Sequence, residues 1–176
     1  MKISKLKNNK YLILRKSTVC DAKDILEYLN CVGGESDYLL FGKDEFLLNI
    51  EEEKAYLRKM NKDNDSIMLL GIIDSEIISV SQVYRVEGER TKHNCEIGIS
   101  VKKKYWRNGI GTIVMKELIG FAKSKNKKNI RLTVNGENYQ AIKMYEKFGF
   151  KKVGENKNYY RINNKFYSRI FMDLSI

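Results

Sequence analysis

The stretch Trp106–Thr112, which reads WRNGIGT, decides the fold that we expect for this chain, because the periodicity of the sequence changes across it. Residues 95–101 before it alternate in the manner of a β-strand, and Gly109–Lys123 carries apolar residues at helical spacing. A short strand is predicted next, at residues 130–134. A strand, a helix and a second strand in this order indicate a parallel crossover.

The two glycines of this stretch, Gly109 and Gly111, lie where the first N–H groups of a helix have no intrahelical partner. Without a Cβ the backbone approaches a ligand closely, and the helix dipole adds about half a positive charge, which suits a pyrophosphate. Arg107 adds charge-assisted contacts. Two glycines also fit a tight turn that binds nothing. The stretch is not a P-loop, and Val114 replaces the third glycine of the dinucleotide fingerprint.

The segments on either side of the crossover complete the expected fold. Asp74-Ser75 suits a two-residue hairpin connection, and a first helix begins after Ser17-Thr18 and ends at Gly33-Gly34. We predict an α/β (α+β) fold, in which a central mixed, mostly antiparallel sheet of six to seven strands is flanked by about four helices. Further strands are expected at residues 11–16, 66–73, 76–84, 150–159 and 166–174, and further helices at residues 44–60 and 139–148.

Length and composition point to one globular domain over residues 1–176. The chain has 43% hydrophobic and 31% charged residues, no Pro-rich or Ser/Gly-rich linker and no repeat. Its apolar runs are shorter than the roughly 18 to 20 residues that cross a bilayer, so we expect a cytoplasmic protein with no membrane partner. The three cysteines lack metal-binding spacing and are expected to be small buried hydrophobes, with no metal bound.

The net charge of +11 leaves three interpretations open: a basic solvated surface, attraction of an anionic ligand, or binding of nucleic acid. The Lys-rich segments 102–104 and 123–128 lie in predicted turns or at a helix end, where cations suit the solvent and the dipole. This placement favours a solvated surface. No helix-turn-helix or RNA-stacking motif is present, and we expect no nucleic-acid partner.

Two motifs together carry a resemblance to a known family. Residues 96–101 (EIGISV), followed by 105–112 (YWRNGIGT), resemble the central acetyl-CoA motif of the GNAT acetyltransferase superfamily. Residues 138–150 (NYQAIKMYEKFGF) resemble the family's N-x-x-A-x-x-x-Y-x-x-x-G-F segment, at the expected distance after the parallel strand. The resemblance covers nearly the whole chain. It departs from the family pattern at Trp106, where the family commonly has Gln or Arg.

The resemblance implies acetyl-CoA as co-substrate, bound where the parallel strand pair splays apart. The pantetheine arm is expected to pair with backbone groups in the gap, as an added strand would. The residues that the resemblance implies for cofactor binding are Ile99, Ser100, Val101, Arg107, Asn108, Gly109, Ile110, Gly111, Thr112, Asn138 and Tyr145.

The resemblance also implies direct transfer in a ternary complex, in which a neutral amine attacks the thioester. Tyr145 matches the tyrosine that protonates the departing sulfur, and a half-buried packing tyrosine on an amphipathic helix is the alternative. Glu96 is the candidate base, and a salt-bridged strand glutamate is the alternative. His93 is either a second candidate base or a solvated turn residue. Asn138 either contacts the cofactor or caps the next helix.

We therefore expect an acyltransferase that acetylates a primary amine of a small molecule or of a peptide or protein N-terminus. Residues 150–172 are similar to bacterial relatives that acetylate ribosomal-protein N-termini or polyamines, although Ser168 stands where such relatives often have an aspartate. The alternative is a non-catalytic CoA-sensing or basic regulatory module of the same fold. A homodimer is compatible with either function.

Overall fold

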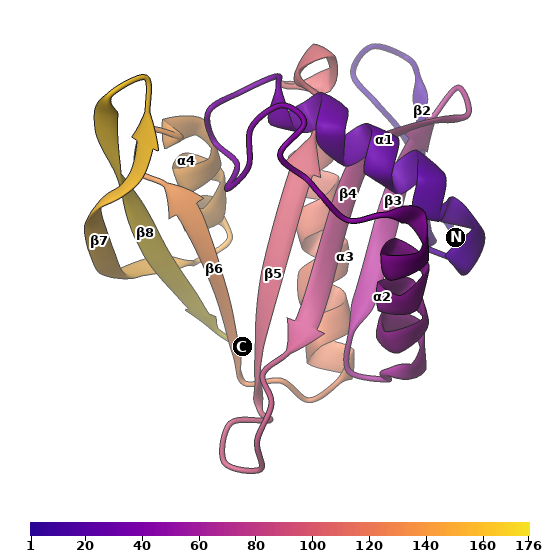
Figure 1. The fold of residues 1–176 in the computed structure, drawn as a ribbon. Coiled ribbons are helices and arrows are strands. Elements are labelled where there is room, and N and C mark those ends of the chain that lie inside the picture. Colours follow the sequence, from indigo (N-terminus) through magenta and orange to yellow (C-terminus); the bar gives the residue numbers. More distant parts are fainter.

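The computed structural model of the chain describes residues 1–176 and places eight strands in one sheet (Figure 1). In sheet order the strands are β1 (Lys2–Lys5), β2 (Tyr11–Lys16), β3 (Ile67–Ile73), β4 (Glu76–Arg85), β5 (Asn94–Val101), β6 (Asn129–Asn135), β8 (Lys165–Ser175) and β7 (Lys151–Ile162). The helices are α1 (Ala22–Gly33), α2 (Ile50–Lys62), α3 (Ile110–Ser124) and α4 (Tyr139–Lys147). All neighbouring strands are antiparallel except β5 and β6, so the predicted mixed sheet is confirmed.

The sheet has one strand more than the upper limit of the predicted six to seven, and the additional strand is β1. This edge strand reads KISK and pairs antiparallel with β2, with Ile3 opposite Ile13. It has a single apolar residue, and that side chain is exposed, so no alternation of buried and solvent-facing side chains marks it in the sequence. Its partner strand and the tight turn between them hold it in the sheet.

The second helix begins later than predicted. Residues 44–49 precede it, and Asn49 is its N-cap: the side-chain oxygen accepts hydrogen bonds from the N–H groups of Glu51 and Glu52. The carboxylate of Glu52 in turn accepts from the N–H of Asn49 at 2.8 Å, which completes a capping box. The apolar spacing of residues 46–50 resembles a helix, but this cap fixes the start at Ile50.

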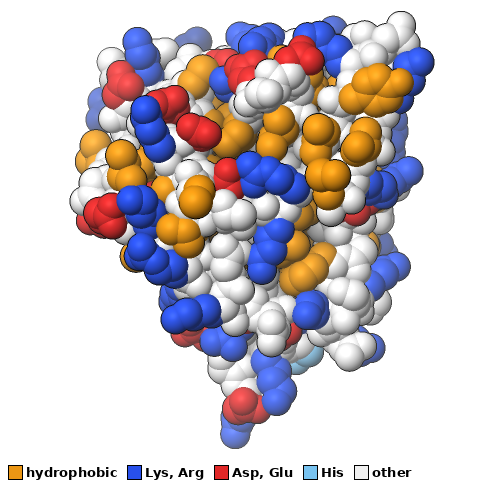
Figure 2. Space-filling view, turned by 90° about the vertical axis from the view of Figure 1, so that its right-hand side faces the viewer, with side chains coloured by type: hydrophobic (Ala, Val, Ile, Leu, Met, Phe, Trp, Pro, Cys, Tyr) orange, Lys and Arg blue, Asp and Glu red, His pale blue; other side chains and the backbone are white.

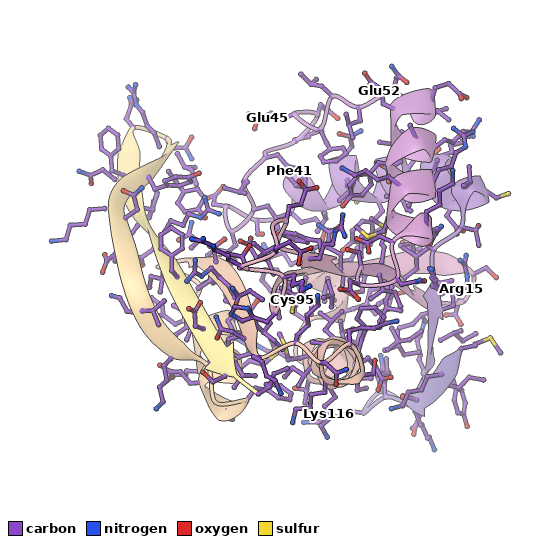
Figure 3. All side chains as sticks on the ribbon, turned by 90° about the horizontal axis from the view of Figure 1, so that it is seen from below. Arg15, Phe41, Glu45, Glu52, Cys95 and Lys116 are labelled. Carbon is purple, nitrogen blue, oxygen red and sulfur yellow. The ribbon has the colours of Figure 1, made fainter.

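The two faces of the sheet are covered by different helices. Helices α1 and α2 lie on one face and α3 and α4 on the other (Figure 1). Figure 3 agrees, because Phe41 of the α1–α2 connection and Lys116 of α3 lie on opposite sides of the sheet. Each face has its own apolar cluster. The first includes Ile25, Tyr28, Leu57, Met60 and Leu70, and the second includes Ile97, Val114, Leu118, Leu132 and Tyr145.

The parallel strands β5 and β6 are paired over only part of their length. Residues Asn94–Glu96 pair with Asn129–Arg131, and no pairing continues beyond them. The strands then diverge. Residues Ile97–Val101 of β5 are therefore not paired with β6, and residues Leu132–Asn135 of β6 are not paired with β5. We call these two unpaired segments the splay. The parallel pair and its divergence, both predicted, are confirmed.

Two expectations about individual side chains are wrong. Cys20 and Cys31 are exposed, because they lie in a short turn and on the outer face of α1, and only Cys95 is a buried cysteine. Lys127 belongs to a segment interpreted as solvated, yet it is 3% exposed. Its ammonium donates to Asp65 at 2.7 Å and to the carbonyl of Lys92 at 2.8 Å, which satisfies the buried charge.

The remaining basic side chains are mostly distributed over the surface. On the face shown in Figure 2, Lys and Arg side chains are scattered, with fewer Asp and Glu side chains among them, and they do not form one stripe. Lys102 and Lys104 both donate to Glu76, and these hydrogen bonds lower the pKa of its carboxyl to about 2. None of the helices combines the length and the apolar character needed to cross a bilayer.

Candidate active site

The turn before α3 presents uncapped backbone amides. Gly109 is the N-cap of this helix and accepts its first hydrogen bond, from the N–H of Ile113 at 3.1 Å. No side chain caps the helix, so the N–H groups of residues 110–112 have no acceptor within it. The geometry therefore offers three donors and the positive end of a helix dipole at one place, as the sequence predicts.

Each of the two glycines at this turn is required for a different structural reason. Gly109 has a φ of 83°, which a residue with a side chain adopts only under strain, and a Cβ there would meet nothing within 4 Å. The space beside Gly109 is therefore open to a ligand. A Cβ on Gly111 would lie 3.0 Å from the sulfur of Met144 in α4. The second glycine allows α3 and α4 to pack closely, a role that the sequence analysis did not assign to it.

The two residues before Gly109 shape the turn. Arg107 is exposed and has a φ of 63°, in the left-handed region that non-glycine residues rarely adopt. The side-chain amide of Asn108 donates to the carbonyls of Tyr105 and Trp106, both at 3.2 Å. These hydrogen bonds hold the turn in shape while the Arg107 side chain stays exposed to solvent.

Trp106, the departure from the family pattern, packs toward the sheet. Its indole N–H donates to the carbonyl of Val101 at 2.7 Å, and its ring stacks on Tyr38 at 6.2 Å between centroids. The indole thus ties the end of β5 to the turn and to the connection between α1 and α2. The side chain at this position therefore has a structural role in the turn.

The backbone of β5 has an unpaired edge at the splay. The N–H of Lys102 donates to the carbonyl of Ile78 in β4, and alternate residues of a strand direct their backbone groups to the same neighbour. The groups of Ile99 and Val101 therefore face the splay. Ser100 faces β4: its carbonyl accepts from the hydroxyl of Ser79 at 2.9 Å. Of the three β5 residues expected to meet the cofactor arm, two face the unpaired edge.

Helix α4 carries Tyr145, and Asn138 is the N-cap residue at its start. Tyr145 is 6% exposed and packs on Phe150 at 5.9 Å between ring centroids. Burial raises the pKa of its phenol above the usual range, so the group is protonated at neutral pH. The oxygen of Asn138 accepts from the N–H of Ala141 at 3.2 Å, so this residue is the helix cap that the sequence analysis left as one alternative.

Glu96 lies at the last paired position of β5, where the two strands begin to part. Its carboxylate accepts a hydrogen bond from the hydroxyl of Tyr84 in β4 at 3.0 Å, in place of the ion pair that was the alternative. Burial and the neighbouring Glu96 raise the pKa of Tyr84 to about 12. His93 is exposed at the opposite, closed end of the strand pair. Glu96 is therefore the candidate base that faces the splay.

A third group at the splay was missed by sequence reasoning. Arg169 of β8 donates to the hydroxyl of Thr133 in β6 at 3.0 Å and to the hydroxyl of Tyr159 in β7 at 2.8 Å. The side-chain amide of Asn135 reaches the carbonyl of Asp37 at 3.1 Å, which joins the α1–α2 connection to β6. These residues come from distant segments, and no local motif marks them. Only the pairing of β6 with β8 brings Arg169 to the splay.

Comparison with known proteins agrees with this geometry. The family described as "Acetyltransferase (GNAT) family" matches residues 38–150, which include the β5 strand, the glycine turn and the α4 motif. The chain belongs to the GNAT acetyltransferase family. The resemblance that the two motifs carry is thereby confirmed at the level of the family, together with its acyltransferase class and its use of acetyl-CoA.

This GNAT chain is similar in sequence or structure to three individual proteins. It is 29% identical over 116 residues to the acetyltransferase PseH of Campylobacter jejuni, across 65% of this chain and 70% of that protein. It is 28% identical over 105 residues to the L-amino acid N-acetyltransferase AaaT of Escherichia coli, across 59% of this chain and 65% of that protein. A crystal structure of a GNAT-family acetyltransferase from Streptococcus pneumoniae superposes with a TM-score of 0.89 at 28% identity, covering 94% of this chain and 99% of that one.

Proposed function

We propose that residues 1–176 form a single catalytic domain that transfers the acetyl group of acetyl-CoA directly to a primary amine, on a small molecule or a peptide or protein N-terminus. One observation carries the proposal: the uncapped amides that follow Gly109 and the unpaired edge of β5 at Val101 belong to one continuous surface, joined by the Trp106 hydrogen bond. Phosphates and an amide-containing arm need these two features side by side.

The residues of this surface fit acetyl-CoA by their chemistry. The N–H groups of residues 110–112 suit the pyrophosphate, and the open space at Gly109 leaves room for it. Asn108 positions the turn, and Arg107 adds a positive charge. The unpaired N–H and C=O groups of Ile99, with the N–H of Val101, suit the amides of the pantetheine arm. Asn138 keeps its side-chain N–H donors for the same arm after its oxygen has capped α4.

Two side chains at the splay transfer protons in this reaction, one as an acceptor and the other as a donor. Acetyl-CoA, when bound, supplies an acyl group on a good leaving sulfur. Glu96 accepts a proton from the attacking amine, directly or through water, and the Tyr84 hydroxyl fixes its carboxylate. The unpaired N–H groups of β5 stabilise negative charge on the acyl oxygen. The Tyr145 hydroxyl makes no hydrogen bond within the protein, and as a protonated phenol it donates to the departing sulfur.

Two measurements in sequence test this proposal. A thermal-shift titration with acetyl-CoA should raise the Tm, because a ligand that binds only the folded state stabilises it. Thiol release with a panel of primary amines should then identify turnover. Binding without turnover of any amine would favour the non-catalytic sensor, and no shift at millimolar acetyl-CoA would contradict the binding site itself.

A further inference from the structure

Arg169 is held in one place by neutral groups alone. Its two terminal nitrogens donate to the Tyr159 and Thr133 hydroxyls, and its guanidinium lies 4.8 Å from the Tyr159 ring centroid and 5.4 Å from that of Phe171. The Nε atom is buried and has no hydrogen-bond partner. Two aromatic rings and two fixed hydrogen bonds preorganise a cation whose charge no protein carboxylate neutralises.

The neighbouring arginine on the same face of the sheet shows the contrast. Arg131, on β6, forms a two-pronged ion pair with Asp173 of β8, with both nitrogen–oxygen distances at 2.9 Å. Arg169 stands four residues further along β8, toward the splay, where it lies opposite Asn135, and it has no such partner. A partly enclosed cation without a counter-charge costs free energy unless a ligand supplies the missing anion at its terminal nitrogens.

The position of Arg169 sets the size of that ligand. Thr133, which holds one end of the guanidinium, follows Arg131 by two residues, and Arg131 is the partner of Glu96 across the strand pair. Two residues along a strand span roughly 7 Å. Neighbouring strands add a sideways spacing of about 4.8 Å to this offset. A span of this scale favours a small acceptor whose amine and carboxylate lie close together, such as an α-amino acid with a hydrogen bond of about 2.9 Å at each end. Burial and the Glu96 charge raise the pKa of Tyr84, and the positive charge of Arg169 acts in the opposite direction. Arg169 therefore lies close enough to Tyr84, the hydrogen-bond donor to Glu96, for its charge to act there.

We infer that the acceptor is an amine that carries a carboxylate, a free amino acid, whose carboxylate pairs with Arg169 while its amine faces Glu96. This inference rests on the proposed function, because it names the acceptor of that reaction. A polyamine brings a second positive charge toward Arg169, where it finds no partner. A peptide or protein N-terminus has an amide where the free amino acid has its carboxylate, so it leaves the guanidinium without an anion.

The test compares matched acceptors on the wild-type protein. The twenty L-amino acids, their amides and the corresponding amines without the carboxyl group are each assayed for thiol release with acetyl-CoA. For the best amino acid we expect a kcat/KM about 10- to 100-fold above that of its amide, the range of a charge-assisted hydrogen bond. The 2-hydroxy acid of the same side chain should inhibit competitively against the amino acid.

Variants then assign the preference to Arg169. Arg169→Gln should lower kcat/KM for the amino acid about 10- to 100-fold, mainly through KM, and leave the amide within a few-fold of wild type. Arg161→Gln is the matched control: Arg161 lies on the same hairpin, donates to Asn164 at 2.9 Å and is exposed, so both acceptors should be unaffected. The thermal shift with acetyl-CoA confirms that each variant folds and binds.

Three outcomes would overturn the inference. Amides turned over as well as the free acids would remove the carboxylate requirement, and the proposed acetyl transfer would stand. An equal loss of both acceptors in Arg169→Gln would make the residue structural only. If no amine in the panel, including amides and polyamines, releases thiol, the proposed function fails and the inference fails with it.

Discussion

At the scale of single residues, Gly109 is the position of the proposed site that has open space beside it. Gly109→Glu places a carboxylate in the open space beside the uncapped amides, where the phosphates would lie. We expect affinity for acetyl-CoA to fall at least 100-fold in an isothermal titration, because like charges repel and a side chain fills the space.

Two controls separate this effect from folding. Gly120→Glu makes the same change on the exposed face of the same helix, where a Cβ also meets nothing within 4 Å, and it should bind acetyl-CoA as wild type does. Gly109→Ala carries the strain of the positive φ without the charge, and it should lose stability but keep most of its affinity. Unchanged binding by Gly109→Glu would refute the phosphate site.

Tyr145 is expected to act on turnover and not on binding. Tyr145→Phe removes the hydroxyl and keeps the ring that packs on Phe150. We predict kcat for acetyl transfer about 100-fold lower, the lower end of general-acid catalysis, with an unchanged dissociation constant for acetyl-CoA. Pre-steady-state thiol release measures this step. A variant with wild-type kcat would assign Tyr145 to the core alone.

Individual site residues were predictable only where a local motif contains them. The glycine turn, Tyr145 and Glu96 lie in the two motifs and could be named from the sequence. Trp106 could be named as a departure, but its hydrogen bond to Val101 depends on how the turn folds back over β5. Arg169 could not be found, because its two hydroxyl partners come from other strands.

At the scale of elements, the junction between β2 and α1 depends on one partly buried ion pair. Hydrogen bonds from Arg15 at 2.6 and 2.8 Å lower the pKa of Asp21 to about 2, and Thr18 adds further hydrogen bonds. The folded-state pKa lies below the unfolded value. This carboxylate therefore stabilises the fold above about pH 4, and the contribution is lost as the pH falls toward 2.

Asp21→Asn should consequently destabilise the protein at pH 7 by roughly 2 kcal/mol and flatten the decline in stability between pH 4 and 2. Urea denaturation at a series of pH values measures both effects. Asp24→Asn, in the exposed first turn of α1, is the control and should behave as wild type. If the stability of Asp21→Asn declines between pH 4 and 2 as steeply as that of the wild type, the ion pair has no such role.

Elements were predicted well where the local pattern and the tertiary structure agree. The hairpin connection Asp74-Ser75 is one case: both residues adopt positive φ, at 50° and 65°, as a tight two-residue turn requires. Residues 44–49 are the opposite case, because their apolar spacing indicates a helix that the Asn49 cap excludes. Strand β1 depends on its partner strand, and no pattern within four residues reveals it.

At the scale of the whole molecule, the splay between β5 and β6 is the feature on which every proposal depends. The sequence indicates a parallel pair, but periodicity does not say where two strands stop pairing, and only the resemblance implied it. The structure ends the pairing at Glu96 and Arg131. Glu96, the proposed base, lies at that point. The unpaired edge of β5 and the arginine proposed to bind a carboxylate lie beyond it.

Amide hydrogen exchange, followed by NMR with and without acetyl-CoA, shows whether the cofactor pairs with the unpaired edge of β5. The N–H groups of Ile99, Val101 and residues 110–112 have no acceptor in the free protein, and we expect acetyl-CoA to slow their exchange at least 10-fold. The amides of β1 and β2, at the far edge of the sheet, should exchange at an unchanged rate. Unaltered exchange at Ile99 and Val101 with saturating acetyl-CoA would contradict the account.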